Sequence, residues 1–334
     1  MNAPASPPDA TTAPQRRQRP LLGIGLIVLI AGLFATLDTT VRLTGRSVPV
    51  LGLLWVRYAL QALLMALWLG RNVWLGRGPG LRSHHPRFQL LRGVLLLVTS
   101  ALGFLAVQHL PVAEFTAIVM LTPVLVTLLS AWLLHEHTST LRWLLVAGAF
   151  IGTLVVVRPG SGLFGWAALL PLASCATYAM FQLLTRKLAG LEHPLTTHFY
   201  SGLVGTLLLT PLLLGAAWHA APGSGPTALG ALLAAAPGVW GAMLLVALCG
   251  TVGHLLLIVA LSVAPAATLM PFMYLQIALA GLLGWLVFGD LPDAWAWTGM
   301  GVIAACGATS AWLNLREAAP EEAVARAAVA AEED

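Results

Sequence analysis

Residues 103–136 read GFLAVQHLPVAEFTAIVMLTPVLVTLLSAWLLHE, and this stretch indicates the fold class. Pro111 divides it into two apolar runs, and the second run is long enough to cross a bilayer before it ends near Glu136. Across the whole chain, 58% of the residues are hydrophobic and 9% are charged. Because a soluble domain carries about 25% charged residues, these proportions predict an integral membrane protein.

Similar apolar runs recur along the chain and predict an all-α protein with ten transmembrane helices. Each run is continuous rather than alternating, which favours helices over membrane β-strands. Arg16, Arg17 and Arg19 precede the first run, but no small-residue cleavage site follows it, so we expect it to stay in the protein. The expected spans are 21–41, 49–69, 90–109, 111–134, 141–157, 163–185, 196–217, 239–261, 264–288 and 295–314.

The distribution of Lys and Arg predicts the orientation. Ten spans place both termini on one side, and the tails and loops of that side hold 13 of the 17 basic residues. The opposite loops hold Arg42, Arg46 and Arg158. By the positive-inside rule both termini are expected in the cytoplasm, so the net charge of +4 requires no nucleic-acid partner.

Two parts of the sequence resemble each other at an offset of 154 residues. Residues 106–113 read AVQHLPVA and residues 260–267 read ALSVAPAA. An apolar span, an acid and a tryptophan follow each copy, namely Glu136 and Trp143 in the first and Asp290 and Trp297 in the second. Since five spans is an odd number, the second copy is expected upside down relative to the first, as in many secondary transporters.

The run at 103–136 and the run PFMYLQIALAGLLGWLVFGDLPD at 271–293 resemble the duplicated EamA repeat of the drug/metabolite transporter superfamily. The second run is also similar to a subgroup of S-adenosylmethionine uptake and riboflavin transporters. Two positions depart from the pattern, because Ile277 stands opposite Pro123 and Asp290 replaces the usual Glu.

The resemblance implies a multi-pass protein of the bacterial inner membrane, with no enzyme activity and no cofactor. The expected organisation is a disordered cytoplasmic tail (1–20), a first EamA repeat (21–158), a second EamA repeat (159–315) and an acidic, Ala-rich cytoplasmic tail (316–334). We expect a secondary active transporter that moves a small polar or amphipathic metabolite by alternating access. S-adenosylmethionine-like, riboflavin and amino-acid-type solutes are the first candidates. A membrane-embedded enzyme and a non-transporting scaffold are the alternatives.

Three charged residues lie within the spans and are candidates for substrate binding or gating. Arg57 is about 12 Å from the nearer end of its helix, and Asp38 and Glu114 lie at a comparable depth. A charge at the bilayer centre costs about 2.5–3.5 kcal/mol and therefore needs a partner or a water-filled cavity. We hypothesise that Arg57 faces a central cavity and pairs with one of these acids. The alternative is that Arg57 snorkels and the acids lie among the lipid headgroups.

His254 is the one histidine that the expected spans place deep in the membrane, and it aligns with Ser100 at the repeat offset. An imidazole titrates between pH 5 and 8, so His254 is the candidate for proton coupling. The alternative is a neutral imidazole hydrogen-bonded to a neighbouring helix.

Uncharged polar side chains at mid-depth form a second group of candidates for substrate binding, either by stacking and hydrogen bonding or as polar contacts between helices. They are Gln61, Ser100, Tyr178, Tyr274 and Gln276.

No catalytic or metal motif accompanies these residues. Residues 135–139 read HEHTS rather than HExxH, and the three cysteines lie in apolar segments without metal-binding spacing. Pro123 and Pro271 are expected to bend their helices. The small pair Gly148 and Gly152 permits close helix packing, which is compatible with either a monomer or a homodimer.

Overall fold

The computed structural model describes residues 20–76, 78, 80–122, 124–126, 129, 140–158, 165–188, 191–220, 227–263 and 272–333. Pro123, Pro271 and the segment around Glu136 lie outside the described residues. Within these ranges the chain forms helices and no strand, which confirms the all-α class.

The helices follow the apolar runs of the sequence. Their bounds are α1 (Pro20–Thr44), α2 (Val50–Trp74), α3 (Pro86–His109), α4 (Val112–Val119), α6 (Thr140–Val157), the 3-10 turn η1 (Gly165–Ala168), α7 (Leu169–Leu188), α8 (Pro194–Trp218), α9 (Ala228–Leu233), α10 (Pro237–Val263), α12 (Leu275–Phe288) and α13 (Ala294–Glu333).

Six of the described helices are long and apolar enough to cross a membrane, namely α1, α2, α3, α7 with its preceding turn, α8 and α10. Three shorter apolar helices span Val112–Val126, Trp143–Val157 and Leu275–Phe288. These nine fall on nine of the expected spans, so the chain is a helical, multi-pass membrane protein. The tenth expected span, 295–314, lies within α13.

Two boundaries differ from the expectation. Helix α3 begins at Pro86, and proline is favoured as the first residue of a helix. Gln89 and Arg92 therefore lie well inside the helix, although the tally of basic residues counted Arg92 with the loop before this span. Helix α13 continues to Glu333, through the segment expected as a separate tail, because alanine and glutamate are strong helix formers. The short α9 was not expected, and its first turn is capped by Thr227, whose hydroxyl accepts from the Gly230 amide.

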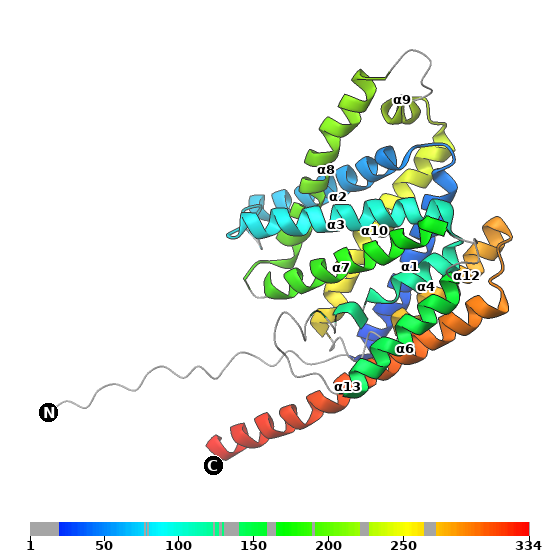
Figure 1. The fold of residues 1–334 in the computed structure, drawn as a ribbon. Coiled ribbons are helices and arrows are strands. Elements are labelled where there is room, and N and C mark those ends of the chain that lie inside the picture. Colours follow the sequence, from blue (N-terminus) through cyan, green and yellow to red (C-terminus); the bar gives the residue numbers. More distant parts are fainter. Residues whose placement is uncertain are drawn as a thin grey trace.

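The helices form two groups (Figure 1). One group contains α2, α3, α7 and α8, and the other contains α1, α4, α6, α10, α12 and α13. Helix α10 packs on α2, and α1 packs on α3, so these contacts join the groups. The polar site described below lies along this boundary.

Glycines allow the closest helix crossings. A Cβ on Gly202 of α8 would stand 2.7 Å from the backbone nitrogen of Ala62 on α2, and one on Gly205 would overlap the ring of Tyr58. Gly148 and Gly152 of α6 lie against Cys306 and Gly299 of α13. The Gly148/Gly152 pair therefore serves packing within one chain.

The Gly202 crossing gives a stability prediction. Gly202→Ala should destabilise the protein by about 1–3 kcal/mol, because the methyl group meets backbone that cannot rotate away. Thermal unfolding of the detergent-solubilised protein would measure the loss. Gly215→Ala on the same helix is the control, since nothing lies within 4 Å of its Cβ position. An equal melting temperature for the two variants would contradict the assignment of Gly202 to a tight crossing.

Candidate functional site

Arg57 lies at the centre of the bundle and is 3% exposed. Its Nη1 donates to the hydroxyl of Ser100 on α3, and Tyr58 bonds the same hydroxyl at 2.8 Å. The Arg57 guanidinium lies over the rings of Tyr58 and Phe104, at 4.9 and 5.7 Å from their centroids. Its Nε has no hydrogen-bond partner. In the described part of the chain, no ion pair joins Arg57 to Asp38 or Glu114, the partners that we hypothesised.

Arg92 is a second buried arginine, also 3% exposed, on the adjacent helix α3. Its Nε donates to the Thr185 hydroxyl at 2.7 Å, and its Nη1 donates to the Thr197 carbonyl at 3.0 Å and the Ser201 hydroxyl at 2.7 Å. All three acceptors are uncharged. The positive charge of Arg92 is therefore held by hydrogen bonds, with no acid paired to it among the described residues.

Tyr178 of α7 connects the two arginines, because its phenol lies within electrostatic range of both guanidinium groups. Its ring stacks on Phe181 at 5.6 Å, and the Arg92 guanidinium lies 4.4 Å from the Phe181 centroid. Tyr178 is partly exposed, whereas both arginines are buried.

Two histidines complete this group. His198 of α8 is 2% exposed, and its backbone carbonyl accepts from Gln61 at 3.0 Å. Its ring lies 6.4 Å from that of His254 on α10, and the Nε2 of His198 has no partner. The Nδ1 of His254 lies 2.8 Å from the Gly250 carbonyl of its own helix. We call these side chains the central cluster: Arg57, Gln61, Arg92, Ser100, Tyr178, His198 and His254.

The remaining predicted residues lie elsewhere. Asp38 of α1 accepts from Gln276 of α12 at 3.4 Å and is within electrostatic range of Arg57, so this pair borders the central cluster. The Tyr274 hydroxyl is directed at the Met120 carbonyl, 3.5 Å away. Glu114 of α4 is 6% exposed, and its Oε2 lacks a partner.

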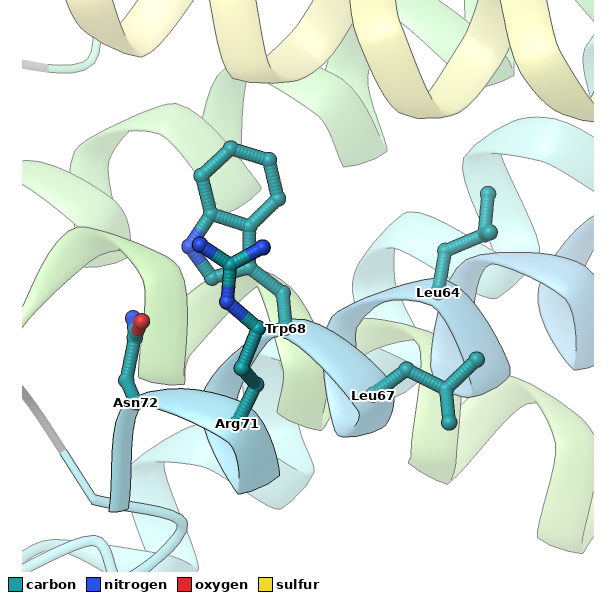
Figure 2. A pocket seen from close by; sticks show the side chains of 5 residues that line it. All are labelled: Leu64, Leu67, Trp68, Arg71 and Asn72. Atoms are coloured by element: carbon teal, nitrogen blue, oxygen red, sulfur yellow. The ribbon is translucent and has the colours of Figure 1, made fainter. Parts of the chain in front are cut away.

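A hollow of about 370 Å³ opens along α2, beyond Gln61 (Figure 2). It is lined by Leu64, Leu67, Trp68, Arg71 and Asn72. Figure 2 shows that all five come from successive turns of this helix. The hollow thus lies on the half of α2 that leads away from Arg57 toward the α2–α3 connection.

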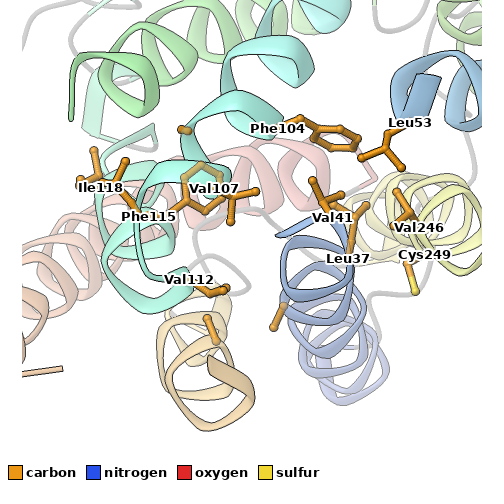
Figure 3. Close-up of a cluster of buried hydrophobic side chains, with 14 of the residues drawn as sticks. Leu37, Val41, Leu53, Phe104, Val107, Val112, Phe115, Ile118, Val246 and Cys249 are labelled. Atoms are coloured by element: carbon orange, nitrogen blue, oxygen red, sulfur yellow. The ribbon is translucent and has the colours of Figure 1, made fainter. Parts of the chain in front are cut away.

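An apolar layer borders the central cluster on the opposite side (Figure 3). Leu53 is one turn from Arg57, Phe104 is one turn from Ser100, and Val246 is one turn from Gly250. Together with Leu37 and Val41 of α1, these side chains are at most 6% exposed. On their helices, these side chains lie toward the end of the bundle where α1 connects to α2 and α3 connects to α4.

Beyond the apolar layer, ion pairs join the first and second parts of the chain. Arg42, in the last turn of α1, pairs with Asp290 after α12, and Arg158 pairs with Asp293 at 2.7 Å. Arg158 adopts a left-handed φ of 47° at the end of α6. We call this group the Asp290 junction.

A second polar junction lies at the other end of the bundle, where α2 connects to α3 and α7 connects to α8 (Figure 1). The Oε1 of Glu192 accepts from the Ser83 hydroxyl at 2.6 Å and from the amides of His84 and His85 at 2.7 and 2.8 Å. Partial burial alone would raise the pKa of Glu192, but these hydrogen bonds outweigh it and hold the pKa below its usual value. We call this group the Glu192 junction.

No cluster of three potential metal ligands occurs within the described ranges.

Five members of the central cluster were predicted from the sequence, whereas Arg92 and His198 were not. Arg92 was counted with a loop, and His198 lies at the edge of its expected span. The spacing Gln89–Arg92 on one helical face, directly before an apolar run, is the signal that could have revealed this site.

Comparison with protein-family models gives two matches for the EamA-like transporter family, at residues 21–158 and 165–309. The chain belongs to this family. The transporter family and its transporter relatives exclude the enzyme alternative. A solved crystal structure with 18% identity aligns with a TM-score of 0.58 over 89% of this chain and 97% of that chain, which supports the fold alone.

Several relatives are named transporters. The riboflavin transporter of Rhizobium johnstonii is 32% identical over 67% of this chain and 69% of its own length. The riboflavin transporter of Vibrio cholerae is 28% identical over 86% of this chain and 92% of its own. The S-adenosylmethionine uptake transporter of Rickettsia prowazekii is 24% identical over 64% of this chain and 67% of its own. These relatives match the subgroup suggested by the sequence.

The lowered pKa of Glu192 predicts a pH dependence of stability. The carboxylate stabilises the folded state fully above its unfolded pKa of about 4.3, and this stabilisation is lost as the pH falls through the lower folded-state pKa. Thermal unfolding should therefore distinguish wild type from Glu192→Gln at pH 7, and the difference should vanish near pH 3. A difference that stays constant with pH would contradict this assignment.

Proposed function

We propose that this protein is a secondary carrier that moves a small metabolite across the inner membrane by alternating access between two inverted repeats. The observation that carries the proposal is the central cluster, in which Arg57, Arg92 and His198 are buried and His254 is partly buried at the meeting of α2, α3, α7, α8 and α10. A scaffold would gain nothing from such charges, since burying each one in a membrane costs free energy. Carriers place polar groups at this depth to bind solute.

The packing of the helices supports the inverted repeat. In an inverted repeat, α1, α2, α3, α4 and α6 correspond in this order to α7, α8, α10, α12 and α13. A two-fold axis then requires that a contact between two helices recur between their two counterparts. Helix α1 packs on α10 as α7 packs on α3, and α3 packs on α8 as α10 packs on α2. Three of the five corresponding pairs are also in contact with each other, namely α2 with α8, α4 with α12 and α6 with α13.

The two junctions fit the role of gates, because each joins residues of the first repeat to residues of the second at one end of the bundle. The apolar layer closes the side of the Asp290 junction, and the hollow on α2 lies on the side of the Glu192 junction. The basic loops also lie at the Glu192 end, so the positive-inside rule places that end and both termini in the cytoplasm. We therefore assign the described conformation to a state that is closed toward the outside.

Riboflavin is the first solute to test, because two relatives that are 32% and 28% identical to this chain are named for it. S-adenosylmethionine and amino acids follow. Uptake of radiolabelled solutes into proteoliposomes, with and without a pH gradient, tests the function. We expect saturable uptake of at least one solute above the level of protein-free liposomes. Absence of flux for the whole panel would contradict a carrier.

His254 is the candidate for proton coupling, because its ring borders His198 of the central cluster and also lies against Phe34 of α1. We predict that His254→Gln abolishes uptake driven by a pH gradient while solute counterflow continues, since exchange needs no net proton movement. Counterflow and gradient-driven uptake in the same proteoliposomes provide the comparison. Equal loss of both activities would remove the coupling role.

The Asp290 junction predicts charge-swap behaviour. Arg42→Asp places two carboxylates together and should lower uptake up to about fivefold, since a partly exposed ion pair contributes at most about 1 kcal/mol. The double variant Arg42→Asp/Asp290→Arg should restore it. Arg46→Asp, an exposed neighbour, is the control for added negative charge. Lack of rescue by the double variant would exclude a gate that depends on this pair.

A further inference from the structure

The central cluster carries an excess of positive charge. Arg57 and Arg92 contribute two charges, and Asp38 is the acid that borders them. Even with both imidazoles neutral and Asp38 ionised, the net charge of this group is +1, and it rises to +2 when Asp38 is protonated. Because unpaired charge is costly in a membrane, an additional negative charge would stabilise the site.

The free atoms of the arginines show where a ligand could contribute that charge. Among the described residues, the Nε of Arg57 has no partner, and of its terminal nitrogens only Nη1 donates, to Ser100. Arg92 uses Nε and Nη1, while no hydrogen bond to a described residue involves its Nη2. The Nε2 of His198 is also buried without a partner. These atoms can donate to oxygen atoms of a ligand, and arginine donors suit carboxylate and phosphate groups.

The surroundings of the arginines favour a ligand that is partly aromatic or apolar. Tyr178 and Phe181 form a stacked wall beside Arg92, and Phe104 lies against Arg57. Gly250 allows its helix to approach the Arg57 guanidinium closely, because a Cβ there would stand 2.8 Å from Nε. An organic acid could place its charged group between the arginines and its apolar part along this wall.

We propose that Arg57 and Arg92 form an anion-receiving site, which selects solutes by charge in the order anion, neutral, cation. This inference rests on the proposed carrier function and narrows its substrate to organic molecules with a net negative charge, carried by a carboxylate or phosphate. It also ranks the candidates: riboflavin 5′-phosphate should bind better than riboflavin, and the cationic S-adenosylmethionine should bind weakest.

Matched pairs of ligands test the proposal. Riboflavin and riboflavin 5′-phosphate differ by a phosphate, and succinamide and succinate differ by carboxylate charge. Binding to the full-length protein in lipid nanodiscs is measured for each by thermal stabilisation over a concentration series. We expect an anion to bind at least about tenfold more tightly than its neutral partner. The two pairs show whether the site prefers phosphate or carboxylate.

Variants assign the preference to the arginines. Arg57→Gln and Arg92→Gln should each reduce the anion preference about tenfold, and Arg57→Lys should retain part of it because the charge remains. Arg87→Gln is the matched control, since Arg87 is exposed on the same helix as Arg92. Should the glutamine variants fail to fold, the Lys variant and the ligand order of the wild type still decide the question.

The outcomes are separable. Tighter binding of S-adenosylmethionine than of riboflavin 5′-phosphate, or an anion preference that survives in both folded glutamine variants, would overturn the anion site. Failure of both anions to bind more tightly than their neutral partners would overturn it as well. Anion binding that depends on the arginines, without flux of any solute in proteoliposomes, would leave the anion site standing and reject the carrier function.

Discussion

The rest of this structure depends on the cost of holding two guanidinium groups inside a bundle of membrane helices. Arg57 and Arg92 are both 3% exposed, and no acid forms an ion pair with either in the described part of the chain. A membrane interior offers no water to solvate them, so hydroxyls, carbonyls and aromatic faces must do so. Ser100, Thr185, Thr197 and Ser201 supply this solvation from three helices.

This requirement links packing to the site. The Arg92 contacts to Thr197 and Ser201 lie where α3 and α8 approach closely, since a Cβ on Gly93 would stand 2.6 Å from the Cβ of Val204. Gly202 and Gly205 permit the neighbouring approach of α8 to α2. A carrier must release such contacts when it changes conformation. Polar contacts at both ends of the bundle, together with an apolar layer on one side of the cluster, suit the alternating access that we propose, because partly exposed ion pairs are weak enough to break.

Much of the site follows from composition. In an apolar chain with 9% charge, each polar residue within a span is conspicuous, and Arg57, Gln61, Ser100, Tyr178 and His254 were predicted for that reason. The structure brings these five together. Arg92 and His198 escaped prediction because they lie near the ends of spans, where a basic residue is ordinarily solvated. Tyr274 and Glu114 are also polar residues within the spans, but they contact other helices. The depth of a residue in the membrane does not determine which face of its helix the side chain lies on.

The sequence by itself therefore determined the membrane class, the helices, the family and an incomplete set of polar residues. Hydropathy is a local property, so a single chain is sufficient to read it. Only the tertiary structure decided that Arg57 bonds Ser100 rather than Asp38 or Glu114, and that Arg92 belongs to the same cluster. Those contacts depend on how each helix is rotated and tilted against its neighbours, which packing between distant parts of the chain determines.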